Sequence, residues 1–171
     1  WTPLSSKALL DPNGGTQNPW SWSQYDNGTA LYYVTATYDA PMPQSQSNMK
    51  APVPTRTGYT FDGYYTKTAD GSWGKKYYGT MTESGSKCLS SAGNWKETAS
   101  VVRLYAKWTP NVYKITLDKN GATTAGTAVL YLKYEDGWYG SGTPASAANG
   151  GAGSVAGSKL SSITKPSGYA G

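Results

Sequence analysis

Residues that could do chemistry are few and widely spaced in this chain of 171 residues. The chain has no histidine, so it lacks the usual general base and the usual neutral metal ligand. Asp62 and Asp70 flank a glycine-rich turn and could form a carboxylate pair for glycoside cleavage. Aspartates close to glycines more often hydrogen-bond within turns. We therefore expect a protein that is not an enzyme and that holds no cofactor.

Oxygen ligands and the single thiol give weak signals. Asp11 with Asn13, and Asp118 with Asn120, each put two oxygen-bearing side chains into a turn. Neither turn has the later acidic residue of a calcium loop, so we expect no metal. The single cysteine, Cys88, excludes an intrachain disulfide. It is either a buried thiol or a covalent link between two chains.

Aromatic side chains give the strongest binding signal, because the chain contains 15 Tyr and 7 Trp. Trp20 and Trp22 would lie on one face of an extended segment, with Tyr25 close by, and could stack on the apolar faces of sugar rings. Alternatively, these rings cover the sheet as a lid. A second, weaker candidate contact for a sugar or an anion, with cation–π pairing as its alternative, consists of Trp73, Lys75, Lys76 and Tyr77.

The charge pattern argues against a nucleic-acid partner. The net charge is +5, but the basic residues are scattered and only Lys75 and Lys76 are adjacent. No apolar run approaches the roughly 20 residues of a transmembrane helix, so we expect a chain that does not span a membrane. It starts at Trp1 without a signal peptide, and we expect it to be a piece of a longer protein.

The element pattern predicts a mostly β protein. Alternating apolar and polar residues predict strands at 31–38, 59–65 with an interruption at Gly63, 101–108 and 113–117. In the third of these, Arg103, Tyr105 and Lys107 should face away from the core. Helical periodicity is poor, and we expect at most short helices within 44–51 and 83–99. Residues 140–158 are almost entirely Gly, Ala and Ser, which predicts a flexible loop or one ordered by a partner.

Parts of the sequence occur twice. Trp1-Thr2-Pro3 returns at 108–110, and the turn at 11–15 returns at 118–122, both displaced by 107 positions. Gly28-Thr29-Ala30 returns at 126–128, displaced by 98 positions. The sequence therefore predicts a complete module at 1–107 and a partial second module at 108–171. The Asn-Gly pair of each turn predicts a type I′ turn with positive φ at both residues.

Two segments carry a family resemblance: Gly58-Tyr59-Thr60-Phe61-Asp62-Gly63-Tyr64-Tyr65 and Leu104-Tyr105-Ala106-Lys107-Trp108. With the Asn-Gly turns, the chain resembles the Listeria–Bacteroides repeat, the internalin-type B repeat of bacterial surface proteins. That resemblance implies a small β-grasp-like, α+β fold, strung in tandem on secreted or wall-attached proteins without catalytic activity. The chain departs from the family at Tyr64, where Trp is usual, and in its longer loops. The residues that match the motif are Asn13, Gly14, Gly58, Tyr59, Phe61, Gly63, Leu104, Tyr105, Trp108, Asn120 and Gly121.

Two hypotheses of function follow. The first is an extracellular or cell-surface structural module that acts as a stalk, spacer or fibre subunit. Its partners would be neighbouring repeats or further copies; if the chain ends at Gly171, its second sheet would offer an edge for strand addition. The second is a carbohydrate-binding or host-adhesion module that uses Trp20, Trp22 and Tyr25.

Overall fold

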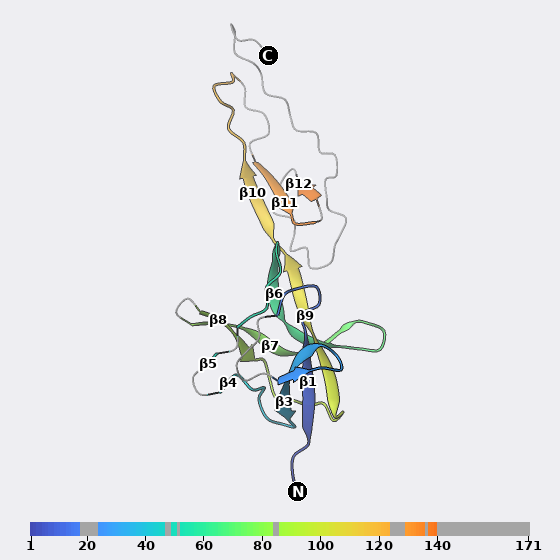
Figure 1. The fold of residues 1–171 in the computed structure, drawn as a ribbon. Coiled ribbons are helices and arrows are strands. Elements are labelled where there is room, and N and C mark those ends of the chain that lie inside the picture. Colours follow the sequence, from blue (N-terminus) through green and yellow to red (C-terminus); the bar gives the residue numbers. More distant parts are fainter. Residues whose placement is uncertain are drawn as a thin grey trace. The chain divides into compact units, whose positions relative to one another are not determined.

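The computed structural model describes residues 1–17, 24–46, 49–50, 52–83, 86–123, 129–135 and 137–139 (Figure 1). The chain divides into two compact units, Trp1–Trp108 and Thr109–Gly171. This boundary lies one residue after the predicted end of the first module. Trp20, Trp22 and the Gly/Ala/Ser-rich segment 140–158 lie outside the described residues.

The described residues form strands and turns. The strands are β1 (Ser5–Asp11), β2 (Gln24–Asp26), β3 (Leu31–Thr37), β4 (Ser45–Gln46), β5 (Met49–Lys50), β6 (Tyr59–Lys67), β7 (Trp73–Glu83), β8 (Ser86–Ser91), β9 (Val101–Pro110), β10 (Val112–Thr116), β11 (Val129–Lys133) and β12 (Gly137–Tyr139). Four of them agree with the strands predicted from alternation, β3, β6, β9 and β10. The prediction of a mostly β protein is confirmed.

The first unit is built on a seven-stranded sheet in the order β2-β3-β1-β9-β6-β7-β8 (Figure 1). Strand β1 lies between β3, its antiparallel neighbour, and β9, which runs parallel to it. In β9, Leu104 and Ala106 are fully buried in the core, as the alternation predicts. The first and last strands of this unit are thus adjacent and point the same way.

Aromatic side chains with polar ends dominate the core. The largest fully buried side chain is Trp95, whose indole N–H donates a hydrogen bond to the Ser6 hydroxyl, 3.0 Å away. The ring centroids of Tyr77 and Trp95 are 4.5 Å apart. Burial raises the pKa values of Tyr64 and Tyr78 far above the usual range, which keeps both hydroxyls protonated.

The helices predicted within 44–51 and 83–99 are wrong for the described residues of these segments. The first contains β4 and β5, and the second contains β8 followed by turns and irregular chain. Strand β8 pairs with β7 and buries Cys88 and Leu89, so tertiary pairing outweighs a weak helical pattern. Cys88 is therefore a buried thiol. No helix occurs among the described residues, and the β-grasp-like topology remains a prediction.

Strand β6 continues through Gly63 and ends at Lys67, two residues after the predicted end. Gly63 has φ +149°, and a Cβ there would lie 2.4 Å from the carbonyl oxygen of Tyr78 on β7. Only glycine lets the two strands approach so closely. The predicted interruption at Gly63 is thus wrong: the glycine maintains the strand.

The two Asn-Gly turns have the same geometry. Asn13 and Asn120 both have φ +45°, and the glycines that follow have φ +83° and +80°. In each turn the Asn backbone N–H donates to the Asp carboxylate two residues earlier, at 2.8 and 2.9 Å. The prediction of positive φ at both residues is confirmed. The turn after β1 does not connect β1 to its antiparallel partner directly, because that partner is β3.

The strand pair β1–β3 of the first unit and the strand pair β10–β11 of the second unit share a further similarity. The backbone N–H of Tyr38, after β3, donates to Leu4 O at 2.8 Å; that of Tyr134, after β11, donates to Asn111 O at 2.9 Å. The next residues, Asp39 and Glu135, have φ +61° and +57°. By this geometry β11 corresponds to β3 at a displacement of 96 positions. The sequence alignment gave 98, and a shift of two residues leaves every side chain on the same face.

Candidate functional site

Six side chains from three neighbouring strands lie together on the sheet of the first unit, on the face opposite the core. Strand β6 lies between β9 and β7, and each of the three strands contributes one aromatic ring and one lysine. We call this surface the aromatic–lysine face; its residues are Tyr65, Lys67, Trp73, Lys76, Tyr105 and Lys107.

A β-bulge brings two of these residues to one face. Lys67 pairs with Trp73, and Tyr65 pairs with Lys76, so β7 uses three residues where β6 uses two. The extra residue changes which side of the strand each following side chain occupies. Trp73 and Lys76 therefore both point outward, although strict alternation would separate residues three apart.

Rings and ammonium groups alternate on the aromatic–lysine face. The Lys67 ammonium lies 4.8 Å from the Trp73 ring and 4.6 Å from the centroid of Tyr105. The Tyr65 ring in turn has the Lys76 ammonium at 5.5 Å and the Lys107 ammonium at 5.0 Å. These distances fit cation–π contacts. Trp73 is 40% exposed, so the residue is partly accessible to a ligand.

Asp62 neutralises part of the charge. Its carboxylate accepts a hydrogen bond from the Tyr65 hydroxyl at 3.0 Å. The ammonium groups of Lys76 and Lys107 lie 3.5 Å from its two oxygens. Burial raises the pKa of Asp62, but the Tyr65 hydrogen bond and the two lysines outweigh it, so the pKa is below its usual value. Asp62 therefore remains ionised at neutral pH.

Asp70, the other member of the proposed carboxylate pair, closes a turn. It accepts hydrogen bonds from the hydroxyl of Thr68 and from the backbone N–H and hydroxyl of Ser72, the last two at 3.2 and 3.0 Å. These bonds lower its pKa. Asp70 thus has the role that the turn interpretation predicts, whereas Asp62 lies within strand β6 and has its partners on the sheet.

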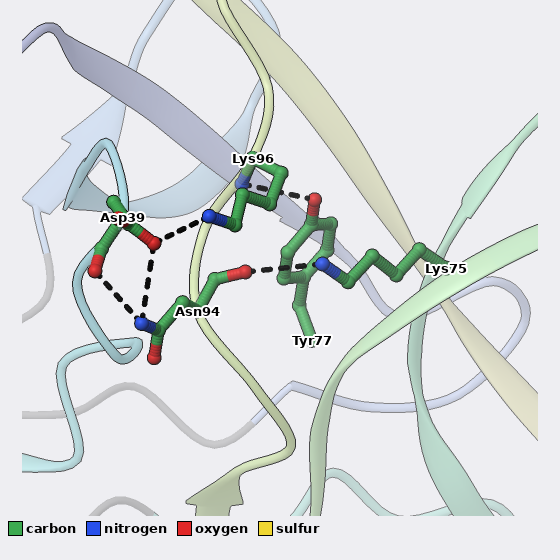
Figure 2. Close-up of polar contacts among 5 residues, drawn as sticks. All are labelled: Asp39, Lys75, Tyr77, Asn94 and Lys96. Carbon is green, nitrogen blue, oxygen red and sulfur yellow. Dashed lines mark hydrogen bonds and ion pairs between the residues drawn. The ribbon is translucent and has the colours of Figure 1, made fainter.

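Lys75 and Tyr77 do not join the aromatic–lysine face, so the structure does not bring the four residues of the second candidate contact together. The Lys75 ammonium lies 5.1 Å from the Tyr77 ring, which fits the cation–π alternative. Tyr77 is fully buried beside Trp95, and the Lys75 ammonium donates to Asn94 O at 3.2 Å (Figure 2). Because of the bulge, Lys75 and Tyr77 point away from Trp73 and Lys76. Of the four predicted residues, Trp73 and Lys76 remain surface candidates.

Figure 2 shows that Lys75 and Tyr77 instead contact Asn94 and Lys96, the residues on either side of Trp95 in the sequence. The Tyr77 hydroxyl accepts a hydrogen bond from the backbone N–H of Lys96 at 3.3 Å. It also donates to the Glu97 carboxylate at 2.7 Å. Burial and the Glu97 contact raise the pKa of Tyr77. The Asn94 amide donates to Asp39 O at 2.8 Å, and Lys96 forms an ion pair with the Asp39 carboxylate.

Tyr25, the described member of the first aromatic cluster, lies on the other face of the sheet. It pairs with Tyr32, which in turn pairs with the core residue Leu10. Tyr25 is 51% exposed and meets the Tyr32 ring edge-on at 5.1 Å. The structure therefore does not bring Tyr25 and Trp73 together.

Several motif residues brace the turn after β1. The Trp108 indole N–H donates to Pro12 O at 3.0 Å, and the Asn13 amide donates to Ala106 O at 2.9 Å. The Phe61 ring meets Trp108 edge-on at 5.5 Å. Near the start of β6, Gly58 has φ +77°, and the Arg56 guanidinium lies 3.9 Å from the Tyr59 ring centroid. Apart from Tyr105, the matched residues described here support the fold.

The residues that sequence reasoning missed as contacts are Tyr65, Lys67, Tyr105 and Lys107. Alternation in 101–108 does place Tyr105 and Lys107 on the solvent side. What it does not show is that β6 lies between β9 and β7, since strand order depends on long-range pairing. The sequence therefore predicts which residues of one strand face solvent, but not which residues of neighbouring strands lie together.

Comparisons of the chain with protein-family models, with curated proteins and with solved structures return no match. Within the described ranges, no three His, Cys, Asp or Glu side chains gather into a group that could hold a metal ion. In the same part of the chain, no helix has the length and apolar character needed to cross a membrane.

Proposed function

We propose that this chain is a non-catalytic structural repeat module of a bacterial secreted or cell-surface protein, acting as a stalk, spacer or fibre subunit. The proposal of an extracellular place rests on the resemblance to internalin-type B repeats. The mechanical part of the proposal rests on the strand order of the first unit.

The observation that carries the proposal is the parallel pairing of β1 with β9, from Lys7 with Val101 to Asp11 with Tyr105. The chain enters this unit through β1 and leaves it through β9. Tension applied along the chain therefore pulls the two strands past each other. The hydrogen bonds between β1 and β9 then share the applied force, and a stalk under tension needs this resistance.

Single-molecule stretching tests this proposal. With handles attached at Thr2 and Thr109 of the full chain, we expect one abrupt unfolding event. It should release about 35 nm of extended chain, given roughly 3.3–3.6 Å for each residue between the handles. Gradual extension at low force, without such an event, would contradict the proposal that the module resists tension.

The fibre-subunit form of the proposal depends on β10. In the described part of the second unit, β10 pairs with β11 alone, whereas β1 pairs along both edges. Apolar side chains of β10 and of the residue after it are also exposed: Val112, Tyr113 and Leu117 are 41%, 44% and 37% exposed. A strand from a neighbouring module would cover this edge by strand addition.

Solution mass as a function of concentration tests the fibre form. We expect the mass from light scattering to rise with concentration for the natural chain. It should rise less for Tyr113→Lys, because a charge beside an open edge opposes strand pairing. A constant monomer mass for both chains would exclude self-assembly through this edge.

A second candidate function, glycan binding, is favoured by the aromatic–lysine face. Exposed rings stack on the apolar faces of sugars, and Trp73 is partly exposed. Tyr25 offers a ring on the opposite face. Trp73→Ala should abolish binding to a glycan array while leaving the melting temperature within a few degrees, because the side chain is partly exposed. Binding that survives this change would exclude the aromatic–lysine face as the site.

A further inference from the structure

The aromatic–lysine face carries more positive than negative charge. Three lysines, Lys67, Lys76 and Lys107, surround one carboxylate, that of Asp62. The formal charge of this group is therefore +2. The next basic residue on β9, Arg103, lies 3.5 Å from the Asp11 carboxylate and adds nothing to the excess. A ligand for this surface should therefore carry negative charge.

Lys67 differs from its two neighbours. Lys76 and Lys107 share Asp62, whereas none of the carboxylates in the described residues lies within ion-pair distance of Lys67. Its ammonium is held between two rings, Trp73 and Tyr105, and its side chain is exposed. Such a cation is positioned in advance and keeps N–H donors free for an anionic group of a ligand.

The spacing of the rings fits an extended polymer. Trp73 lies on β7 and Tyr105 on β9, with β6 and Lys67 between them. Two strand spacings amount to about 10 Å. A ligand that crosses the strands would therefore meet a ring, then a cation, then a second ring.

A sugar acid matches this order. Its ring has an apolar C–H face for an aromatic side chain, and its carboxylate is an acceptor for an ammonium group. Single-stranded nucleic acid also combines rings with negative charge, but it carries a phosphate at every nucleotide and is usually bound in a longer basic groove. One lysine without a carboxylate partner between two rings fits a sparser, carboxylate-bearing chain better.

We propose that the aromatic–lysine face binds a carboxylated polysaccharide, with a sugar carboxylate on the Lys67 ammonium and a sugar ring on Trp73. This inference rests on the proposed glycan-binding function and adds the chemical class of the ligand. It involves no covalent step, and binding should weaken as the salt concentration rises.

Polygalacturonate and its methyl ester test the inference on the full chain, because they share the same sugar rings and differ in the charge of the carboxyl group. We expect the acid to bind at least tenfold more tightly than the ester. Lys67→Gln should weaken binding of the acid about tenfold, as loss of a charge-assisted hydrogen bond does, and should bring the affinities for the acid and the ester close together. Lys119→Gln removes the same charge from the turn of the second unit and should have no effect on either ligand.

The possible results separate the two proposals. Equal binding of acid and ester would overturn the inference and leave glycan binding standing. Binding of neither polymer, together with no binding on a glycan array, would overturn both. Tighter binding of a sulfated polysaccharide or of oligothymidylate than of polygalacturonate would also overturn the inference, since each places a different anion on Lys67. A melting curve for each variant verifies that it is folded.

Discussion

At the scale of single residues, Gly15 shows how closely the first unit is packed around its turn. A Cβ at this position would lie 2.4 Å from the Trp108 ring and 2.8 Å from Thr55 O. Either the Trp108 indole or the backbone would have to move, and the indole hydrogen bond to Pro12 holds it in place. The corresponding position in the second turn is Ala122, which is buried with its methyl group.

Gly15→Ala should therefore lower the free energy of unfolding by about 1–3 kcal/mol, as overpacking usually does. Urea denaturation of the full chain measures this change. Gly28→Ala is the matched control, because a Cβ there would have its nearest neighbour, the Asp26 carboxylate, at 3.7 Å. Equal stability of the two variants would show that the turn relaxes around the methyl group.

Asp26 gives a pH-dependent prediction at the same scale. The hydrogen bond from Lys7, followed by that from the Thr29 hydroxyl, lowers the pKa of Asp26 to about 2. In the unfolded chain the pKa is near 3.9. The contribution of Asp26 to stability is therefore present above pH 4 and is lost as the pH falls from about 4 to about 2.

Denaturation curves at several pH values for the natural chain and for Asp26→Asn test this prediction. The stability difference between the two proteins should be largest above pH 4 and should shrink as the pH approaches 2. Other aspartates with lowered pKa values, such as Asp39 and Asp70, affect both proteins equally. A difference that stays constant between pH 5 and 2 would contradict the assigned role of Asp26.

At the scale of elements, the segment between β8 and β9 behaves as part of the core. Trp95 is fully buried, and its backbone N–H donates to Ala40 O at 2.8 Å. Trp95→Ala should lower the free energy of unfolding by about 3–5 kcal/mol through the cavity it leaves. Lys96→Ala, which removes an exposed ion pair, should cost far less than Trp95→Ala. Comparable costs in urea denaturation would mean that this segment is not packed as described.

Strand prediction succeeded where one face is buried and the other is open. In β9 and β3, burial of alternate residues produces the period of two that the sequence shows. Two features of the strands were not predicted. The bulge in β7 adds a residue that breaks the period, and the segment 83–99 has too little of either period to reveal its strand. The buried position of Tyr77 could therefore not be predicted.

At the scale of the whole molecule, the similarity of the two Asn-Gly turns was visible in the sequence because it depends on local residues. The Asp-x-Asn-Gly turns have the same φ values and hydrogen bonds in both units. The order of strands in the large sheet was not readable, since β1 meets β9 across more than 90 residues. The aromatic–lysine face depends on that order, and it could therefore be predicted only in part.

The parallel pair β1–β9 is the central element of the proposed stalk. Handles at Thr2 and Thr109 lie beyond opposite ends of the pair and load it in shear. Handles at Thr2 and Ser100 lie at the same end, where the Lys7 backbone N–H donates to Ser100 O, and would open the pair one bond at a time. The two experiments load the same strands in the same protein and differ only in direction.

The ratio of the two unfolding forces, measured at one pulling speed, is the most direct test. If the first unit is a load-bearing module, shear loading should require a clearly higher force than opening from one end. Equal forces, or a lower force in shear, would contradict the assignment of this chain as a structural stalk module.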